Sequence, residues 1–221
     1  MARRFDAVVF DLDGTLLDTL QDLADASNAV LAELGFPQHP VPAYREFVGS
    51  GVRVLFERCL PPDARRDEVI DRCAELFREH YGRHWNRNTR PYPEVPELLD
   101  ALAARGIAMA VLSNKPHEFT RRCVEEFLPR WSFAVVLGQT DTRPRKPDPA
   151  AALEIAERIG VGPQRVAYVG DTSVDMQTAR NAGMFPVGAT WGFRSAEELK
   201  QHGAAALAHR PLELLRVVDA S

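Results

Sequence analysis

Short apolar runs alternate with helical patterns along most of the chain. The apolar runs predict strands over Ala7–Phe10, Ile107–Leu112, Phe133–Leu137, Arg165–Val169 and Pro186–Thr190. Segments with helical periodicity lie between them, over Pro96–Arg105, His117–Leu128, Pro149–Ile159 and Val174–Ala182. Apolar strands that lack polar alternation and are separated by helices are typical of a parallel sheet covered on both faces. We therefore predict an α/β fold with a doubly wound, Rossmann-like core.

One long stretch interrupts this alternation. Between Asp18 and Asn88 the apolar positions recur only at helical spacings, in a first stripe from Leu20 to Leu34 and a second from Val69 to Tyr81. Two shorter helices are predicted between these stripes, over Val41–Val48 and Val52–Leu60. A segment of this length is too long for a loop. We expect an all-helical domain at residues 18–89, inserted into a core formed by residues 1–17 and 90–221.

Composition and charge narrow the class of protein. Hydrophobic residues make up 45% of the chain and the net charge is −4, with no basic field that would favour a nucleic-acid partner. No apolar run approaches the ~18 residues that cross a bilayer, so no membrane association is expected. The three cysteines, Cys59, Cys73 and Cys123, form no disulfide framework and indicate reduced thiols and a cytoplasmic location.

Polar residues follow the predicted strands. In an open α/β sheet, ligands bind at the carboxyl ends of the strands. The polar residues that follow those strands, directly or within the next loop, are Asp11, Asp13, Ser113, Asn114, Lys146, Asp171 and Asp175. The aspartates taken as pairs are also typical of loop and helix caps. Their convergence on one edge of the sheet favours a site.

Four neighbouring carboxylates repel one another unless a cation joins them or some are protonated. Hard oxygen ligands suit Mg²⁺, and Lys146 adds a second cation. The carboxylates still exceed this positive charge by one, so Asp13 is the best candidate to hold a proton and act as a general acid. A carboxylate can attack phosphorus, while Mg²⁺, Lys146 and the Ser113 hydroxyl stabilise the phosphoryl oxygens.

Four segments of the chain carry a family resemblance. Asp11-Leu-Asp-Gly-Thr15, Ser113-Asn114, Lys146-Pro147 and Gly170-Asp-Thr-Ser-Val-Asp175 resemble, in this order, the motifs of the haloacid dehalogenase superfamily. The helical insert resembles the cap domain that this superfamily places between its first and second motifs. Within the superfamily, the chain is most similar to phosphoglycolate phosphatases.

The resemblance implies a role for each motif residue. It implies Asp11 as nucleophile and Mg²⁺ ligand, and Asp13 as general acid and base that binds Mg²⁺ through its backbone carbonyl. Ser113 and Asn114 bind the phosphoryl group, and Lys146 neutralises the nucleophile and that group. Asp171 is a Mg²⁺ ligand, and Asp175 supports it or binds Mg²⁺ through water.

Residues outside the motifs give weaker signals. Arg53 of the cap domain is a candidate to bind a substrate carboxylate, although a solvated helix arginine fits the same pattern. Lys115 is interpreted as a charge at the edge of the site or at the entry of a helix. Trp191 and Phe193 are expected to serve packing rather than recognition.

The sequence thus predicts a Mg²⁺-dependent phosphatase of a small phosphorylated metabolite, with 2-phosphoglycolate favoured and an aspartyl-phosphate intermediate. A sugar-phosphate phosphatase, a phosphomutase or a pyrophosphatase would use the same core. Dehalogenation is disfavoured because dehalogenases resemble this pattern but lack the second aspartate, Asp13. A receiver domain phosphorylated on aspartate is the alternative from another class, and the inserted domain argues against it. A monomer and a homodimer are both compatible with the sequence.

Overall fold

The computed structural model describes residues 4–219; residues 1–3 and 220–221 of the predicted core lie outside the described part. The chain divides into two compact units. Unit 1 consists of Met1–Leu17 and Pro91–Ser221, and unit 2 of Asp18–Arg90. Within the described residues, no helix combines the length and the apolar character needed to span a membrane.

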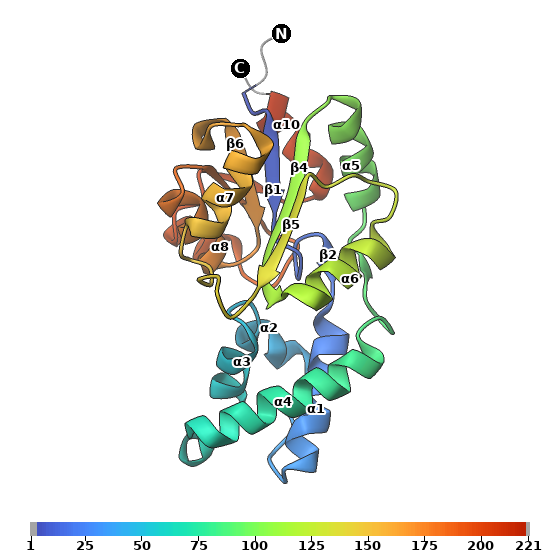
Figure 1. The fold of residues 1–221 in the computed structure, drawn as a ribbon, viewed down its shortest axis with the longest axis vertical. Coiled ribbons are helices and arrows are strands. Elements are labelled where there is room, and N and C mark those ends of the chain that lie inside the picture. The colour runs from blue at the N-terminus through green and yellow to red at the C-terminus, as the bar shows by residue number, and fades with distance from the viewer. Residues whose placement is uncertain (1–3, 220–221) are drawn as a thin grey trace. The chain divides into compact units, whose positions relative to one another are not determined.

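Unit 1 is built on a parallel sheet (Figure 1). Its strands are β1 (Ala7–Phe10), β4 (Ala108–Pro116), β5 (Val135–Gln139), β6 (Val166–Gly170), β7 (Phe185–Ala189) and β8 (Ala206–Ala208). They form a six-stranded sheet in the order β5-β4-β1-β6-β7-β8. The central strand β1 pairs in parallel with both neighbours, so that Ala7 lies opposite Ala108 on one side and Val166 on the other. This arrangement confirms the predicted doubly wound α/β core.

Helices cover both faces of this sheet. They are α5 (Val95–Ala104), α6 (His117–Phe127), α7 (Ala150–Ile159), α8 (Ser173–Asn181), α9 (Ala196–Gln201) and α10 (Leu214–Asp219). Figure 1 shows α7 and α8 on one face, with α5 and α10 on the other. Ala7 and Val9 of β1 join Ile155 in a buried cluster on the first face. Since side chains alternate along a strand, the equally buried Val8 and Phe10 face the other helices.

The core differs from the sequence-based prediction in several places, and β5 begins and ends two residues later than predicted. Strand β4 continues to Pro116, four residues beyond the predicted end at Leu112. The polar residues Ser113–Lys115 had suggested a loop, but all three are buried and extend the strand with an irregular register. The short elements α9, β8 and α10 were not predicted, because three to six residues give too little periodicity to recognise.

Unit 2 is helical, as its periodicity predicted. It contains α1 (Leu20–Glu33), α2 (Tyr44–Phe47), α3 (Val52–Cys59) and α4 (Asp67–His84), with short 3₁₀ turns at Val41–Ala43 and Pro62–Ala64. Aromatic rings fill its core: Phe56 lies 5.9 Å from Phe77, which stacks on Tyr81 at 5.2 Å between ring centroids. Burial raises the pKa of Cys59 to about 12 and that of Cys73 to about 11, so both thiols stay protonated.

The chain enters and leaves unit 2 through two short paired strands, β2 (Leu17–Asp18) and β3 (Arg90–Pro91). Asp22, in the first turn of α1, holds the outgoing segment. Its buried carboxylate accepts hydrogen bonds from the backbone N–H groups of Asn88 and Thr89 and from their side chains, at 2.7–3.0 Å. Both ends of the insert are therefore fixed by hydrogen bonds.

Candidate active site

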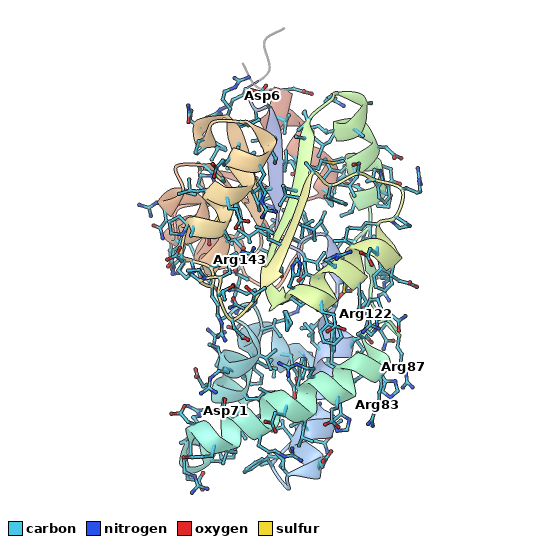
Figure 2. All side chains as sticks on the ribbon, viewed as in Figure 1. Asp6, Asp71, Arg83, Arg87, Arg122 and Arg143 are labelled. Atoms are coloured by element: carbon cyan, nitrogen blue, oxygen red, sulfur yellow. The ribbon has the colours of Figure 1, made fainter. Side chains whose placement is uncertain are left out.

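Buried polar side chains gather at the carboxyl ends of the strands in unit 1. Asp11 follows β1, Asp171 follows β6, and Lys146 lies in the loop between β5 and α7. The two ends of the sheet can be found in Figure 2 from Asp6, which precedes β1, and Arg143, which follows β5. The site lies at the Arg143 end, where ligands bind in open α/β sheets.

The loop after β1 is tightly folded. The carbonyl of Leu12 accepts hydrogen bonds from the N–H groups of Thr15, Leu16 and Leu17, at 3.0–3.3 Å. Gly14 takes a φ of +87°, and a Cβ at this position would collide with the carboxylate of Asp171. Only glycine satisfies both conditions, because it tolerates positive φ and leaves room for the carboxylate.

Lys146 is the central cation of the site. Its Nζ lies 2.9 Å from Asp11 Oδ1 and 2.7 Å from Asp175 Oδ1, and donates to the carbonyl of Leu112 at 3.1 Å. The side chain is only 2% exposed. Burial alone would lower the pKa of Lys146, but the carboxylates of Asp11 and Asp175 outweigh it and hold that pKa well above its usual value. Lys146 is therefore a permanent positive charge.

The buried aspartates of the site repel one another. Burial and the neighbouring Asp175 raise the pKa of Asp11 to about 7, although Lys146 acts in the opposite direction. Burial, Asp11 and Asp175 likewise raise the pKa of Asp171 well above its usual value. In the metal-free protein, therefore, the charged forms of these carboxylates are only partly compensated by Lys146.

The residues present fit a divalent cation. Asp11, Asp171 and Asp175 each offer a carboxylate oxygen, and these oxygens lie within 4.8 Å of one another. Lys146, with its Nζ 2.9 Å from Asp11 Oδ1, supplies a single positive charge against these three buried carboxylates. Buried carboxylates in excess of their positive partners are costly, so a further cation is favoured here. An all-oxygen ligand set of this kind suits Mg²⁺.

Asp171 is oriented by two fixed donors. Its Oδ1 accepts the Thr15 hydroxyl at 2.9 Å, and its Oδ2 accepts the backbone N–H of Phe193 at 2.8 Å. Trp191 in turn donates its indole N–H to the carbonyl of Thr15 at 2.9 Å. The segment after β7 thus orients a candidate metal ligand, a role that the sequence did not reveal for Thr15, Trp191 or Phe193.

Asp175 has a different environment. It forms a capping box with Thr172 at the start of α8, in which Asp175 Oδ2 accepts the Thr172 N–H at 3.1 Å and the Thr172 hydroxyl at 2.6 Å. Its other oxygen faces Lys146. The carboxylate is therefore well placed to orient Lys146, and its predicted part in metal binding stays a prediction.

Ser113 and Asn114, in the last part of β4, have different partners. Ser113 Oγ accepts the N–H of Lys115 at 3.2 Å, which leaves the hydroxyl proton for an acceptor in the site. Both ends of the Asn114 amide bind the backbone of Lys146. The predicted phosphoryl contact of Ser113 therefore suits its geometry, whereas Asn114 is engaged in holding the Lys146 loop.

Asp13 does not join the cluster of the other three aspartates. Its carboxylate instead contacts Lys115, whose Nζ lies 3.0 Å from Oδ1 and 3.2 Å from Oδ2. The sequence pattern indicated only an edge or helix-entry charge for Lys115, which left this residue out of the charge balance. The structure supplies this second lysine, so two lysines and one divalent cation balance four carboxylates. The excess negative charge that predicted a proton on Asp13 is therefore absent until an anionic phosphate ester enters the site.

Arg53, the candidate from the inserted segment, is engaged within unit 2. Its guanidinium contacts Asp67 at 2.7 Å and also pairs with Asp71, which is labelled on α4 in Figure 2. Both carboxylates are exposed, so these surface pairs are weak and can exchange with a ligand. Substrate binding by Arg53 stays a prediction.

Comparison with known families decides the identity of this site. A family model described as haloacid dehalogenase-like hydrolase matches residues 8–189, which include every motif residue named above. The chain belongs to the haloacid dehalogenase-like hydrolase family. This hydrolase therefore carries the family's motifs on the strand ends that the structure brings together.

Its relatives narrow the class further. A phosphoglycolate phosphatase from Aquifex aeolicus is 32% identical over 212 residues, covering 96% of each chain. A phosphoglycolate phosphatase from Pseudomonas putida is 38% identical over 190 residues, covering 84% of this hydrolase and 70% of the relative. The crystal structure of a protein from Lactobacillus delbrueckii subsp. bulgaricus matches with a TM-score of 0.93 at 32% identity, covering 99% of this chain and 100% of the other. The predicted family and the prediction of a phosphatase-type hydrolase are confirmed.

Proposed function

We propose that this hydrolase is a Mg²⁺-dependent phosphatase that cleaves 2-phosphoglycolate through an aspartyl-phosphate on Asp11. The observation that carries the proposal is the buried cluster of Asp11, Asp171 and Asp175, whose carboxylate oxygens lie within 4.8 Å of one another, with Lys146 Nζ 2.9 Å from Asp11. Such a cluster can bind a divalent cation, and a carboxylate in it can attack phosphorus. The choice of 2-phosphoglycolate as substrate is based on the relatives named phosphoglycolate phosphatase.

In the first step, an oxygen of the Asp11 carboxylate attacks phosphorus. The bond between phosphorus and the glycolate oxygen breaks, and Asp13 in its acid form gives its proton to that leaving oxygen. Lys146 and the Ser113 hydroxyl stabilise the negative charge on the remaining phosphoryl oxygens. The products are glycolate and the aspartyl-phosphate of Asp11.

In the second step, the Asp13 carboxylate takes a proton from water. The water oxygen attacks phosphorus, and the bond between phosphorus and the Asp11 oxygen breaks. Inorganic phosphate leaves, and both aspartates return to their starting protonation states. Asp13 thus acts as acid and then as base, which is the behaviour required of one group in a two-step displacement.

Asp11 and Asp171 would hold Mg²⁺, with Asp13 contributing its backbone carbonyl and Asp175 supporting them. Bound Mg²⁺ supplies positive charge that offsets the carboxylates and the phosphoryl group. The chain's own contribution is to aim the ligands: Thr15 and Phe193 orient Asp171, and the folded loop after β1 fixes Asp11.

We further propose that unit 1 is the phosphatase core and unit 2 a cap domain that selects the leaving group. Arg53, on α3 of unit 2, would bind the carboxylate of the substrate. A cytoplasmic location fits the buried cysteines Cys59, Cys73 and Cys123. A small phosphorylated metabolite is the proposed partner; a monomer and a homodimer both fit this mechanism.

The first test is phosphate release from 2-phosphoglycolate, compared with sugar phosphates, nucleotides and pyrophosphate, with Mg²⁺ and with EDTA. The proposal predicts the highest kcat/KM for 2-phosphoglycolate and no turnover in EDTA. Asp11→Asn should abolish turnover, while Asp6→Asn, at the opposite end of the sheet, should not. Equal rates on all substrates would contradict the assignment of 2-phosphoglycolate as substrate. Sustained turnover by Asp11→Asn would contradict the assignment of Asp11 as nucleophile.

The intermediate is tested separately. Asp13→Asn with 4-nitrophenyl phosphate, whose leaving group needs no proton, should form the aspartyl-phosphate but hydrolyse it slowly. Mass spectrometry of the rapidly quenched protein should then find one phosphoryl group on the peptide that contains Asp11. Phosphate release by this variant without any phosphorylated peptide would contradict the two-step mechanism.

A further inference from the structure

Lys115 and Asp13 form a buried ion pair that the chemical steps above do not use. Lys115 Nζ contacts both carboxylate oxygens, at 3.0 Å and 3.2 Å. The Lys115 side chain is 3% exposed and that of Asp13 is 16% exposed. Removing two charges from water is unfavourable, so a pair of this kind is weak evidence for stability alone. The geometry instead suggests a role at the site.

The choice of lysine at this position is unusual for this chain. Lysine and arginine together number 27, but only three of them are lysines: Lys115, Lys146 and Lys200. Lys200 is exposed on α9, whereas Lys115 and Lys146 are the two buried cations of the site. Lysine is a compact point charge on a flexible stem, while the guanidinium of arginine is a wide, planar fork. The site therefore uses compact cations where most of the chain uses arginine.

The backbone of Lys115 is held on three sides. Its N–H donates to Ser113 Oγ at 3.2 Å, and its carbonyl accepts the Thr120 hydroxyl at 3.1 Å. Gly138 of β5 packs so closely that a Cβ there would lie 2.7 Å from the Lys115 carbonyl oxygen. The backbone from which the lysine side chain extends is thus fixed, and this restricts the position of its ammonium group beside Asp13.

The two buried lysines divide the aspartates between them. Lys146 faces Asp11 and Asp175, and Lys115 faces Asp13. Asp11 and Asp13 are only two residues apart, so without this division one cation could attract both carboxylates. Separate cations keep the proposed nucleophile and the proposed acid and base in distinct orientations.

We propose that Lys115 is a positioning residue that holds the Asp13 carboxylate in the orientation needed for proton transfer to the leaving group and from water. The inference rests on the proposed function, because it assigns Lys115 a part in the same reaction. Contact with both oxygens restricts rotation of the carboxylate plane. Loss of such positioning by about 1 Å costs on the order of 10²-fold in rate.

The test is a double-mutant cycle between Lys115 and Asp13, measured with 2-phosphoglycolate and with 4-nitrophenyl phosphate. Lys115→Met should lower kcat/KM for 2-phosphoglycolate by about 10²-fold. Since kcat/KM reports the steps up to release of the first product, the loss with 4-nitrophenyl phosphate should be much smaller. In the Asp13→Asn background, Lys115→Met should change kcat/KM by less than about threefold, because residues that act as a unit are not additive.

Two further variants separate positioning from folding. Lys200→Met changes the exposed lysine and should match the wild type, and Lys115→Arg keeps the charge and should recover part of the loss. Thermal melting shows whether each variant is folded. If Lys115→Met fails to fold, Lys115→Gln, which retains a donor, takes its place in the cycle.

An equal loss in both backgrounds would overturn the inference, because Lys115 would then act without Asp13. A raised KM at unchanged kcat would also overturn it and assign Lys115 to substrate binding. If the wild-type protein hydrolyses none of the phosphate esters, both the proposed function and this inference are overturned. That result is distinct from an active enzyme that does not respond to Lys115→Met, which overturns the inference alone.

Discussion

Asn114 holds the backbone of Lys146 through two hydrogen bonds. Asn114 Oδ1 accepts the Lys146 N–H at 2.9 Å, and Asn114 Nδ2 donates to the Lys146 carbonyl at 3.2 Å. Thirty-two residues separate the two in the chain. The end of β4 and the loop between β5 and α7 are thereby joined, and the ammonium group that faces Asp11 starts from a fixed backbone.

Asn114→Asp tests this arrangement with almost no change in shape. The new carboxylate can still accept the Lys146 N–H, but its second oxygen would face the Lys146 carbonyl and repel it. We expect kcat to fall by about 10-fold to 10²-fold with little change in KM, as for a displaced electrostatic stabiliser. A direct phosphoryl contact would instead raise KM.

Asn181 provides the matched control for this substitution. Its amide donates to the carbonyl of Pro147 in the same loop at 2.9 Å, but this contact is exposed. Asn181→Asp should therefore leave steady-state kinetics unchanged. Equal losses of kcat in the two variants would show that any added negative charge near the Lys146 loop lowers kcat, and that the Asn114 contacts have no special role.

Thr15→Val removes the hydroxyl that orients Asp171 and keeps the shape of the side chain. Because a partner of this kind fixes the orientation of a metal ligand, we expect affinity for Mg²⁺ to fall by about 10-fold to 10²-fold. Calorimetric titration of the metal-free protein with Mg²⁺ measures this change. Thr142→Val alters an exposed threonine of the loop after β5 and should leave the affinity unchanged. Unchanged affinity in Thr15→Val would show that the Thr15 hydroxyl does not orient a metal ligand.

The metal-free protein should lose stability as the pH rises. Burial raises the pKa of Asp11 to about 7, so between about pH 4 and pH 7 the folded protein holds a proton that the unfolded chain has released. Asp171 acts in the same direction. The contribution of a proton bound only in the folded state is present at low pH and is lost as the pH rises through the folded pKa.

Melting temperatures in EDTA should therefore fall from pH 5 toward pH 8, and the increase caused by Mg²⁺ should be larger at pH 8. Asp11→Asn removes this titration and should flatten the slope in EDTA. Asp6→Asn, outside the site, should keep the slope of the wild type. A wild-type slope that Asp11→Asn does not alter would show that other groups control the pH dependence.

Gly14→Ala should strongly destabilise unit 1. The residue has a φ of +87°, and a Cβ there would meet the Asp171 carboxylate and the Phe193 ring. The backbone strain and the steric conflict together should cost about 2–5 kcal/mol. Gly106 is the control: its φ of +62° is also positive, but a Cβ there would meet nothing within 4 Å.

Unfolding in urea measures the difference between these two glycine variants. Gly106→Ala should lose only about 1–2 kcal/mol, the cost of the left-handed backbone. An equal loss in both variants would mean that the loop after β1 moves away from Asp171 without further cost.

Local patterns in the sequence determined most of the elements and the order in which strands and helices alternate. The run Ala7–Phe10 is apolar at every position, which marks a strand buried on both faces, and the observed β1 has the same bounds. Once the strands alternate with helices, their carboxyl ends must meet at one edge. That rule alone places Asp11, Ser113 and Asp171 near one another. Where an element is short, as for β8, the pattern contains too few positions to show a period.

The partners of each site residue were decided only by the tertiary structure. Asp13 faces Lys115 rather than the other aspartates, and Thr15 binds Asp171 across 156 residues of sequence. Spacing along a strand shows which way a side chain points, but a hydrogen bond depends on distances of a few tenths of an ångström between segments that meet only after folding. Sequence could therefore predict which residues form the site, while packing between the strand ends decided which of them act as pairs.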